Sequence, residues 1–251
     1  RLTLLIVAQS LFAESPEVME PLVKAVGFAV SELQEVVDED FGSVVRMLQW
    51  LPTPGNRRRK NLRETLHGII DGIIAKRLVE QASGAEEDRG DLLSMLLLST
   101  DEETGQRLTH EQVRDEVVTI MLAGHETTSN AMTWTWHLLA EHPEVAAKLH
   151  AEVDSVLGGR VPGMEDLRNL PYTAQVFKEA LRLYPPAWVL NTREATTEVV
   201  LGEYALPKGT QFFVSPYIMH RRADLYPDPD AFRPERWTPE FEKSLPRFAY
   251  Y

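Results

Sequence analysis

"AGHETTSNAMTW", residues 123–134, places a glycine, an acid and adjacent threonines inside an otherwise apolar run. Gly124 costs a helix about 1 kcal/mol relative to alanine, and this cost is offset where something bulky approaches the backbone closely. Threonine hydroxyls can bond back to the carbonyl four residues earlier, which loosens or bends a helix. Two interpretations of Glu126 and Thr127 remain open. They lie on a helix that is briefly exposed to water, or beside a planar ligand to which they deliver protons.

This stretch belongs to a longer helical pattern. Thr109 and Gln112 form a capping-box pattern at its start, and apolar residues follow at helical spacing. Pro143 disfavours helical geometry at His142 and marks the end. The sequence therefore predicts a helix over about 110–142. With roughly 30 residues it would be about 45 Å long at the standard rise.

Composition changes along the chain, because four of the 16 prolines precede Pro143 and the other twelve lie from there onward. Long helices are therefore expected first, and turns with short strands in the last third. The opening helix is too short to span a bilayer. Helices are expected over residues 1–13, 56–81, 143–158 and 170–185, and short strands within 198–207 and 210–214.

Charge and cysteine content exclude several functions. The 251 residues carry a net charge of -12, which argues against nucleic acid as a partner because phosphate binding needs a basic surface. The chain has no cysteine, so it has no disulfide, zinc–thiolate site or cysteine nucleophile. A lone histidine beside an acid is more often solvated than metal-bound, and we assign no metal ligand within the sequence. Both ends of the chain look cut.

The segment AGHETT is followed by EALR and then by FRPERW. These three motifs, in this order, resemble those of the cytochrome P450 family, and AGHETT is similar to its distal-helix signature. Glu179 and Arg182 stand three apart on a helix and share a face, where an isolated pair would be a weak surface ion pair. The resemblance implies instead that Arg236 joins them in a structural triad on the proximal side of a haem pocket.

The resemblance also implies functional residues. Glu126 and Thr127 would relay protons, and Arg193 falls where many members bind a haem propionate. Trp188 is either a substrate contact or simply core. The remaining residues that the resemblance places at the cofactor are Ala123, Gly124 and Thr128, and those that it places at the substrate are Leu122, Ala187, Trp188 and Val189.

The expected fold is mainly α with a small β region, a partial cytochrome P450 fold. Residues 1–251 would form part of a single domain, with a helical part over 1–185 and a β meander and proline-rich coil over 186–251. The end, SLPRFAYY, resembles the run into the family's haem-ligand loop. Haem b is therefore expected, with its axial cysteine beyond Tyr251.

The function implied is that of a haem-dependent monooxygenase, which inserts one atom of dioxygen into a small apolar organic substrate. Fatty acids, terpenoids and xenobiotics all suit an apolar pocket. Electrons would come from NAD(P)H through a reductase or ferredoxin, as a separate redox partner or a fused reductase. We expect a cytoplasmic protein, or a membrane-associated one if an anchor precedes residue 1.

Three alternatives remain at this point. The chain is a truncated fold without catalytic activity, a helical module that binds a small molecule without redox chemistry, or a helical interaction domain with no ligand. The acid–threonine pair argues against family members that rearrange hydroperoxides, because these need no proton delivery for oxygen activation.

Overall fold

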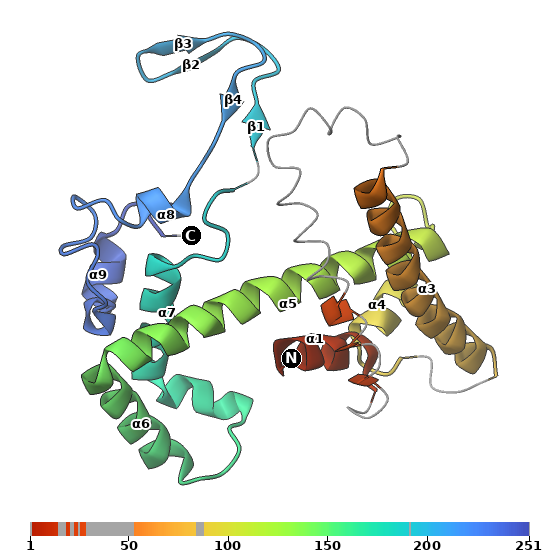
Figure 1. Ribbon diagram of the computed structural model, residues 1–251, viewed down its shortest axis with the longest axis horizontal. Helices are drawn as coiled ribbons and strands as arrows, with labels where there is room; N and C mark the ends of the chain where they lie inside the picture. The colour runs from red at the N-terminus through yellow and green to blue at the C-terminus, as the bar shows by residue number, and fades with distance from the viewer. Residues whose placement is uncertain are drawn as a thin grey trace. The chain divides into compact units, whose positions relative to one another are not determined.

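The computed structural model describes residues 2–14, 19–20, 23–24, 26–28, 53–83, 88–190 and 192–250. Among them it forms two compact units, Arg1–Glu126 and Thr127–Tyr251. Helix α5 (His110–Glu141) runs from the first unit into the second (Figure 1). The predicted division of one domain at residue 185 stays a prediction.

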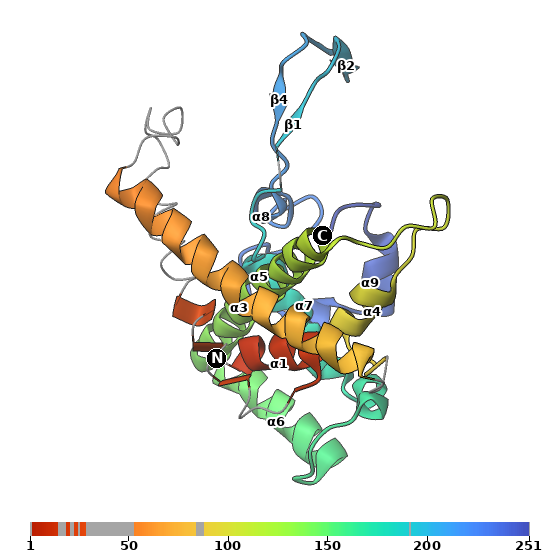
Figure 2. The ribbon, with the colours of Figure 1, turned by 90° about the vertical axis from the view of Figure 1, so that its right-hand side faces the viewer.

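The first unit consists of helices around one apolar core. Helices α1 (Leu2–Phe12), α3 (Pro54–Ala82) and α4 (Leu92–Leu98) lie beside one another in two views (Figures 1 and 2). The predicted helices over 1–13 and 56–81 are thus confirmed. The core takes apolar side chains at helical spacing from each of these helices and from α5: Leu4, Ala8, Leu11, Phe12, Leu66, Ile70, Ile74, Leu93, Val113, Val117 and Met121.

A buried arginine fastens three of these helices together. The Arg77 guanidinium is only 2% exposed, and it donates to Asp91 Oδ1 at 3.0 Å and to the Phe12 carbonyl oxygen at 2.8 Å. Burial alone would raise the pKa of the Asp91 carboxyl, but hydrogen bonds from Arg77 and Ser94 outweigh it and lower that pKa. The cation therefore also satisfies the carboxyl end of α1.

Helix α5 begins and ends where its sequence predicts. Thr109 N–H donates to Gln112 Oε1 at 2.9 Å, and Gln112 N–H donates to Thr109 Oγ1 at 3.2 Å, which is a complete capping box. The helix then continues to Glu141, just before Pro143. Its 32 residues make it about 48 Å long.

In the second unit, the start of helix α7 is held by a residue of the preceding α-helix. Helix α6 (Pro143–Leu157) ends at Gly158, whose φ of 56° is left-handed, as a glycine cap allows. Helix α7 (Pro171–Leu183) has no side-chain cap of its own. Glu152 of α6 supplies one, accepting from the backbone N–H groups of Tyr172 and Thr173 at 2.7 and 2.8 Å. The start of α7 is thereby fixed to α6.

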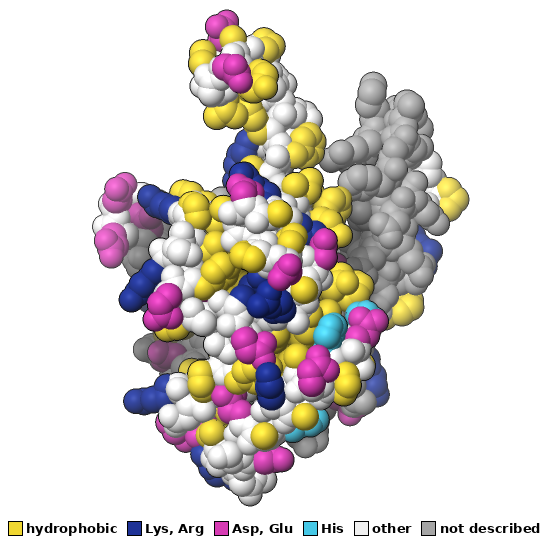
Figure 3. Space-filling model, turned by 90° about the vertical axis from the view of Figure 1, so that its left-hand side faces the viewer, with side chains coloured by type: hydrophobic (Ala, Val, Ile, Leu, Met, Phe, Trp, Pro, Cys, Tyr) yellow, Lys and Arg dark blue, Asp and Glu magenta, His cyan; other side chains and the backbone are white. Residues whose placement is uncertain are grey.

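The β region is small and consists of two antiparallel pairs. Strand β1 (Arg193–Glu194) pairs with β4 (Gln211–Phe212). Between them in the sequence, β2 (Val199–Leu201) and β3 (Tyr204–Leu206) form a hairpin (Figure 1). The hairpin surface carries both hydrophobic and acidic side chains (Figure 3). Strands β2, β3 and β4 lie within the predicted segments, whereas β1 lies before them and was not predicted. The prediction of a mainly α fold with a small β region is confirmed.

The last part of the unit is coil with short helices, as its prolines predict. These helices are α8 (Pro216–Met219), α9 (Pro239–Ser244) and the 3₁₀ turn η3 (Pro234–Arg236). A further 3₁₀ turn, η2 (Met164–Asn169), lies between α6 and α7. In the described part of the chain, no helix is both long enough and apolar enough to cross a membrane.

Candidate functional site

The motif that contains the acid and the threonines is regular helix. Helix α5 stays α-helical through residues 122–128. Ala123, Glu126, Thr127 and Thr128 are exposed, while Leu122 is half-buried. The acid and the alcohol are consecutive residues, so their side chains leave the helix in directions about 100° apart.

Gly124 lets α1 approach α5 closely. A Cβ atom added at this glycine would lie 3.1 Å from Val7 Cγ2, which is tighter than ordinary van der Waals contact between carbons. The sequence predicts that something bulky approaches the backbone here, and the structure identifies Val7 as a group that does so. The predicted role of Gly124 at a cofactor stays a prediction.

We expect Gly124→Val to destabilise the full-length protein by about 1–3 kcal/mol, the usual cost of overpacking a filled contact. The added branches would collide with Val7. Urea unfolding measures the change. The double variant Val7→Ala/Gly124→Val should recover most of the loss, because it makes room for the new side chain. A double variant no more stable than Gly124→Val would show that Val7 is not the group that requires a glycine.

His125, between Gly124 and the acid, is tied to α1. Its Nδ1 lies 2.9 Å from the Thr3 hydroxyl oxygen. Burial lowers the pKa of this imidazole below its usual value, and the nearby Glu126 carboxylate opposes the shift. The ring also lines a small cavity of about 270 Å³ together with Leu4 and Gly27.

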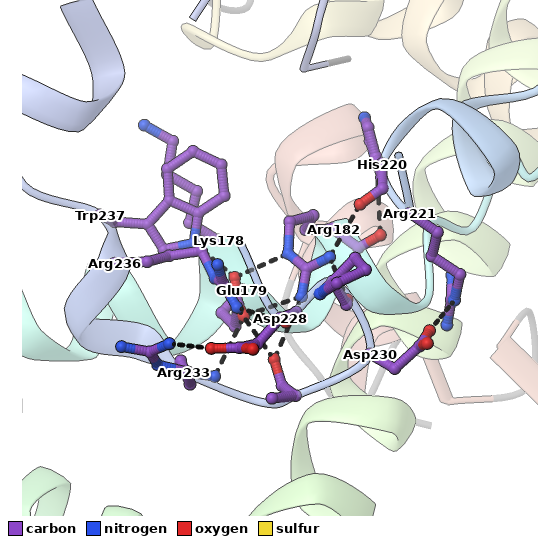
Figure 4. Close-up of polar contacts among 12 residues, drawn as sticks. Lys178, Glu179, Arg182, His220, Arg221, Asp228, Asp230, Arg233, Arg236 and Trp237 are labelled. Carbon is purple, nitrogen blue, oxygen red and sulfur yellow. Dashed lines mark hydrogen bonds and ion pairs between the residues drawn. The ribbon is translucent and has the colours of Figure 1, made fainter. Parts of the chain in front are cut away.

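The carboxylate of Glu179 is the centre of a buried polar cluster in the second unit (Figure 4). Glu179 and Arg182 are both fully buried. Arg182 donates to both carboxylate oxygens at 2.9 Å, through Nε and Nη2, and Arg236 Nε donates to Oε1 at 2.8 Å. The structure thus brings together the three residues of the predicted triad.

The two arginines use their remaining N–H groups on the coil that follows α8. Arg182 donates to the carbonyl oxygens of His220 at 2.8 Å and Pro229 at 2.6 Å. Arg236 donates to those of Pro227 at 2.6 Å and Asp228 at 3.0 Å. Each guanidinium therefore binds a carboxylate and coil backbone at once, which its planar fork of donors allows. The cluster fixes α7 to the coil.

Sequence reasoning misses two further donors to Glu179. The Trp237 indole Nε1 donates to Oε2 at 2.9 Å, and the Arg233 backbone N–H donates to Oε1 at 3.0 Å. Together with the arginines, this gives five N–H groups on one carboxylate. Both residues lie in FRPERW. The sequence signal for the indole donor was a tryptophan directly after Arg236.

The candidate substrate residues do not all share one cavity. Trp188 lines a groove of about 420 Å³ with Trp134, Tyr184 and Tyr217, and Trp134 stacks on Tyr184 at a centroid distance of 4.0 Å. Ala187 is exposed and Val189 is half-buried, and neither lines this groove. The cofactor candidate Arg193 lies in β1 with its side chain exposed.

The chain contains no cysteine. Among the described residues, histidine, aspartate and glutamate side chains form no cluster of three that could hold a metal ion. An iron–thiolate bond therefore needs a ligand from outside residues 1–251.

A buried Glu–Arg–Arg cluster and a long helix with the Ala-Gly-x-Glu-Thr-Thr motif are features of one protein class. The family model described as cytochrome P450 matches residues 1–251, and the chain belongs to this family.

The comparisons with individual proteins agree. The chain is 44% identical over 203 residues to cyclooctat-9-en-7-ol 5-monooxygenase of Streptomyces melanosporofaciens, covering 81% of this chain and 43% of that protein. It is 38% identical over 229 residues to pentalenene oxygenase of Streptomyces avermitilis, covering 87% and 49%. The crystal structure of the cytochrome P450DA heme domain superimposes with a TM-score of 0.78 at 30% identity, over 100% of this chain and 53% of that one. The chain spans about half the length of the curated relatives it matches.

Proposed function

We propose that the full-length protein is a haem-dependent monooxygenase that inserts one atom of dioxygen into an apolar organic substrate. The observation that carries the proposal is the exposed Glu126–Thr127 pair on α5, in a chain of the cytochrome P450 family. An acid next to an alcohol on a helix surface can pass a proton from water to a bound reactant. The match to two oxygenases supports the same reaction class.

The residues present fit the periphery of a haem but not its axial ligand. Arg193 has an exposed guanidinium, which suits a propionate carboxylate. Ala123 and Thr128 are exposed on the same helix as Gly124 and would face the ring. The chain has no cysteine, so the thiolate would come from outside residues 1–251, and it is proposed to follow Tyr251. Bound haem would supply the redox chemistry that activates dioxygen.

The chain's own residues would control protons and positions. Glu126 would take protons from water and pass them to Thr127, whose hydroxyl would donate at the reactant and be reprotonated by the acid. The Glu179 cluster takes no part in proton transfer, because its carboxylate is fully buried and already accepts from two guanidiniums. Its proposed role is to hold the coil on one side of α7 in place.

The substrate is proposed to be a cyclic, mostly hydrocarbon molecule. The names of two relatives state that one acts on cyclooctat-9-en-7-ol and the other on pentalenene. Exposed aromatic and apolar residues near Trp188 suit such a skeleton, because apolar surface binds without needing polar partners. Electrons are proposed to come from NAD(P)H through a reductase or ferredoxin, separate or fused.

Spectra and turnover of the full-length protein test the proposal. A haem absorption band distinguishes a monooxygenase or a small-molecule-binding module from a helical interaction domain with no ligand. The carbon-monoxide difference spectrum of the reduced protein should show thiolate ligation. Oxidation of pentalenene or cyclooctat-9-en-7-ol with a ferredoxin or reductase then separates an enzyme from a binding module. A protein that binds haem through a thiolate but oxidises neither probe nor other apolar substrates would favour the inactive alternative.

A further inference from the structure

Two hydrogen bonds from tyrosine hydroxyls fix residues 249 and 250 beside the Glu179 cluster. Tyr226 is fully buried, and its hydroxyl donates to the Ala249 carbonyl oxygen at 2.9 Å. The Tyr250 hydroxyl donates to the Lys178 carbonyl oxygen at 3.1 Å. These two hydrogen bonds, here called the 249–250 anchor, connect consecutive residues to the cluster. One bond comes from the coil and the other reaches α7, one residue before Glu179.

Packing of aromatic rings fixes the orientation of the anchor. The Tyr250 ring stacks on His220 at a centroid distance of 5.1 Å and meets the edge of Trp237 at 4.8 Å. The Lys178 ammonium lies 4.8 Å from the centre of the Trp237 ring. Offset and edge-to-face contacts of this kind select ring orientations as well as adding buried area. Trp237 and Lys178 therefore serve both the carboxylate cluster and the anchor.

Both hydroxyls remain donors across the accessible pH range. Burial raises the pKa of Tyr226 to about 12, with the nearby Arg182 acting in the opposite sense. Burial also raises the pKa of Tyr250. Burial lowers the pKa of His220 to about 4, so this ring is neutral where it stacks on Tyr250. Neutral rings and protonated phenols keep the contacts of the anchor unchanged near neutral pH.

The backbone just before the anchor is strained. Phe248 has a φ of 66°, a left-handed conformation that is an outlier for a bulky residue. The following Ala249 N–H closes a turn by donating to the Pro246 carbonyl oxygen at 3.0 Å. Such a conformation persists only where surrounding contacts over-determine it. The phenylalanine side chain is 57% exposed, so its own burial contributes little. The anchor holds Ala249 and Tyr250, the two residues that directly follow Phe248.

We infer that Tyr226 and Tyr250 are positioning residues for the segment that follows Tyr251, and that the strained turn and the 249–250 anchor set where this segment leaves the Glu179 cluster. This inference rests on the proposed function, in which that segment carries the axial cysteine. Neither tyrosine touches the cofactor in this account. Each acts through the backbone that it holds.

The test uses Tyr226→Phe and Tyr250→Phe in the full-length protein. Each change removes one hydroxyl and keeps the ring. Tyr172→Phe is the matched control, because its hydroxyl donates to the exposed Glu235 carboxylate at 3.1 Å, away from the anchor. Hydrogen exchange followed by mass spectrometry reports opening of the turn, since the Ala249 N–H is hydrogen-bonded within it. The carbon-monoxide difference spectrum reports the fraction of haem with thiolate ligation.

Both anchor variants should speed exchange in residues 246–250 by roughly five- to tenfold, the factor that corresponds to one ordinary hydrogen bond. Exchange in α7 should stay at the wild-type rate, and the thiolate-ligated fraction should fall. Tyr172→Phe should change neither readout. Wild-type exchange in 246–250, or faster exchange with an unchanged thiolate fraction, would overturn the positioning role. A wild-type protein without any thiolate signature would overturn the proposed function and this role together.

Discussion

Replacing Glu179 with alanine in the full-length protein is expected to abolish haem incorporation. The change removes the carboxylate that accepts from Arg182, Arg236 and the Trp237 indole, all of them buried. Removing one partner of a buried ion pair typically costs about 3–5 kcal/mol, because the remaining charge is uncompensated. That loss is a large share of the roughly 5–15 kcal/mol by which domains are stable. Urea unfolding and the haem absorption band measure the two consequences.

Glu235→Ala is the control for this prediction. Glu235 lies in the same coil, pairs with Lys148 and is about half exposed. An exposed pair contributes at most about 1 kcal/mol, so this variant should keep its haem. Glu179→Gln should fall between the two, since it keeps the shape of the side chain and loses its charge. If Glu179→Ala takes up haem normally and unfolds like wild type, the cluster does not support the pocket.

Thr127→Ala is expected to leave folding, haem uptake and substrate binding nearly unchanged and to uncouple the reaction. The side chain is exposed, so its loss should cost stability no more than about 1 kcal/mol, the usual value of a single hydrogen bond. Positioned acid–base groups typically contribute about 10²–10⁴-fold to a rate. Without the hydroxyl, NAD(P)H would be consumed to make hydrogen peroxide in place of oxygenated product. The ratio of product formed to reductant consumed measures this effect.

Two variants separate proton delivery from helix structure. Thr127→Ser keeps a hydroxyl and should restore most of the coupling. Thr133→Ala removes an exposed threonine of the same helix, whose hydroxyl donates to the Ser129 carbonyl oxygen at 2.8 Å, and should stay coupled. A Thr127→Ala protein as tightly coupled as wild type would mean that this threonine is only a helix residue beside the pocket.

Exposure distinguishes the residues proposed for chemistry from those proposed for structure. Glu126 and Thr127 are exposed on α5, whereas Glu179 and Arg182 are fully buried. A proton relay takes its protons from water, so its groups must be accessible to water. A buried ion pair is out of contact with water, so each charge depends on its partner for compensation. The two substitutions should therefore fail in different ways, one in coupling and the other in assembly.

Local patterns were sufficient to predict helices α1, α3, α5, α6 and α7 and strands β2, β3 and β4, whereas α4 and β1 were not predicted. Pro143 and Gly158 end their helices for backbone reasons that act within a few residues. The spacing of Glu179 and Arg182 likewise predicts one shared helix face. Such signals are short-range, and the sequence alone contains them.

Contacts between distant residues could not be predicted in this way. Arg77 donates to the Phe12 carbonyl oxygen across 65 positions, and Trp237 donates to Glu179 across 58. Neither contact leaves a spacing signal, because the packing of segments far apart in the sequence decides it. Gly124 illustrates both cases. A glycine inside a helix predicts that another group approaches the backbone closely, but only the structure identifies Val7 as that group.

Oxidation under ¹⁸O₂ tests the central claim most directly. The full-length protein would be supplied with NAD(P)H and a reductase, with or without a ferredoxin. The substrates would be pentalenene and cyclooctat-9-en-7-ol, the molecules in the names of its relatives. A monooxygenase is expected to place one ¹⁸O atom in each product molecule and release the other as water, while ¹⁶O₂ in H₂¹⁸O leaves the product unlabelled. Product oxygen derived from water, or oxidation without any label from ¹⁸O₂, would contradict the account.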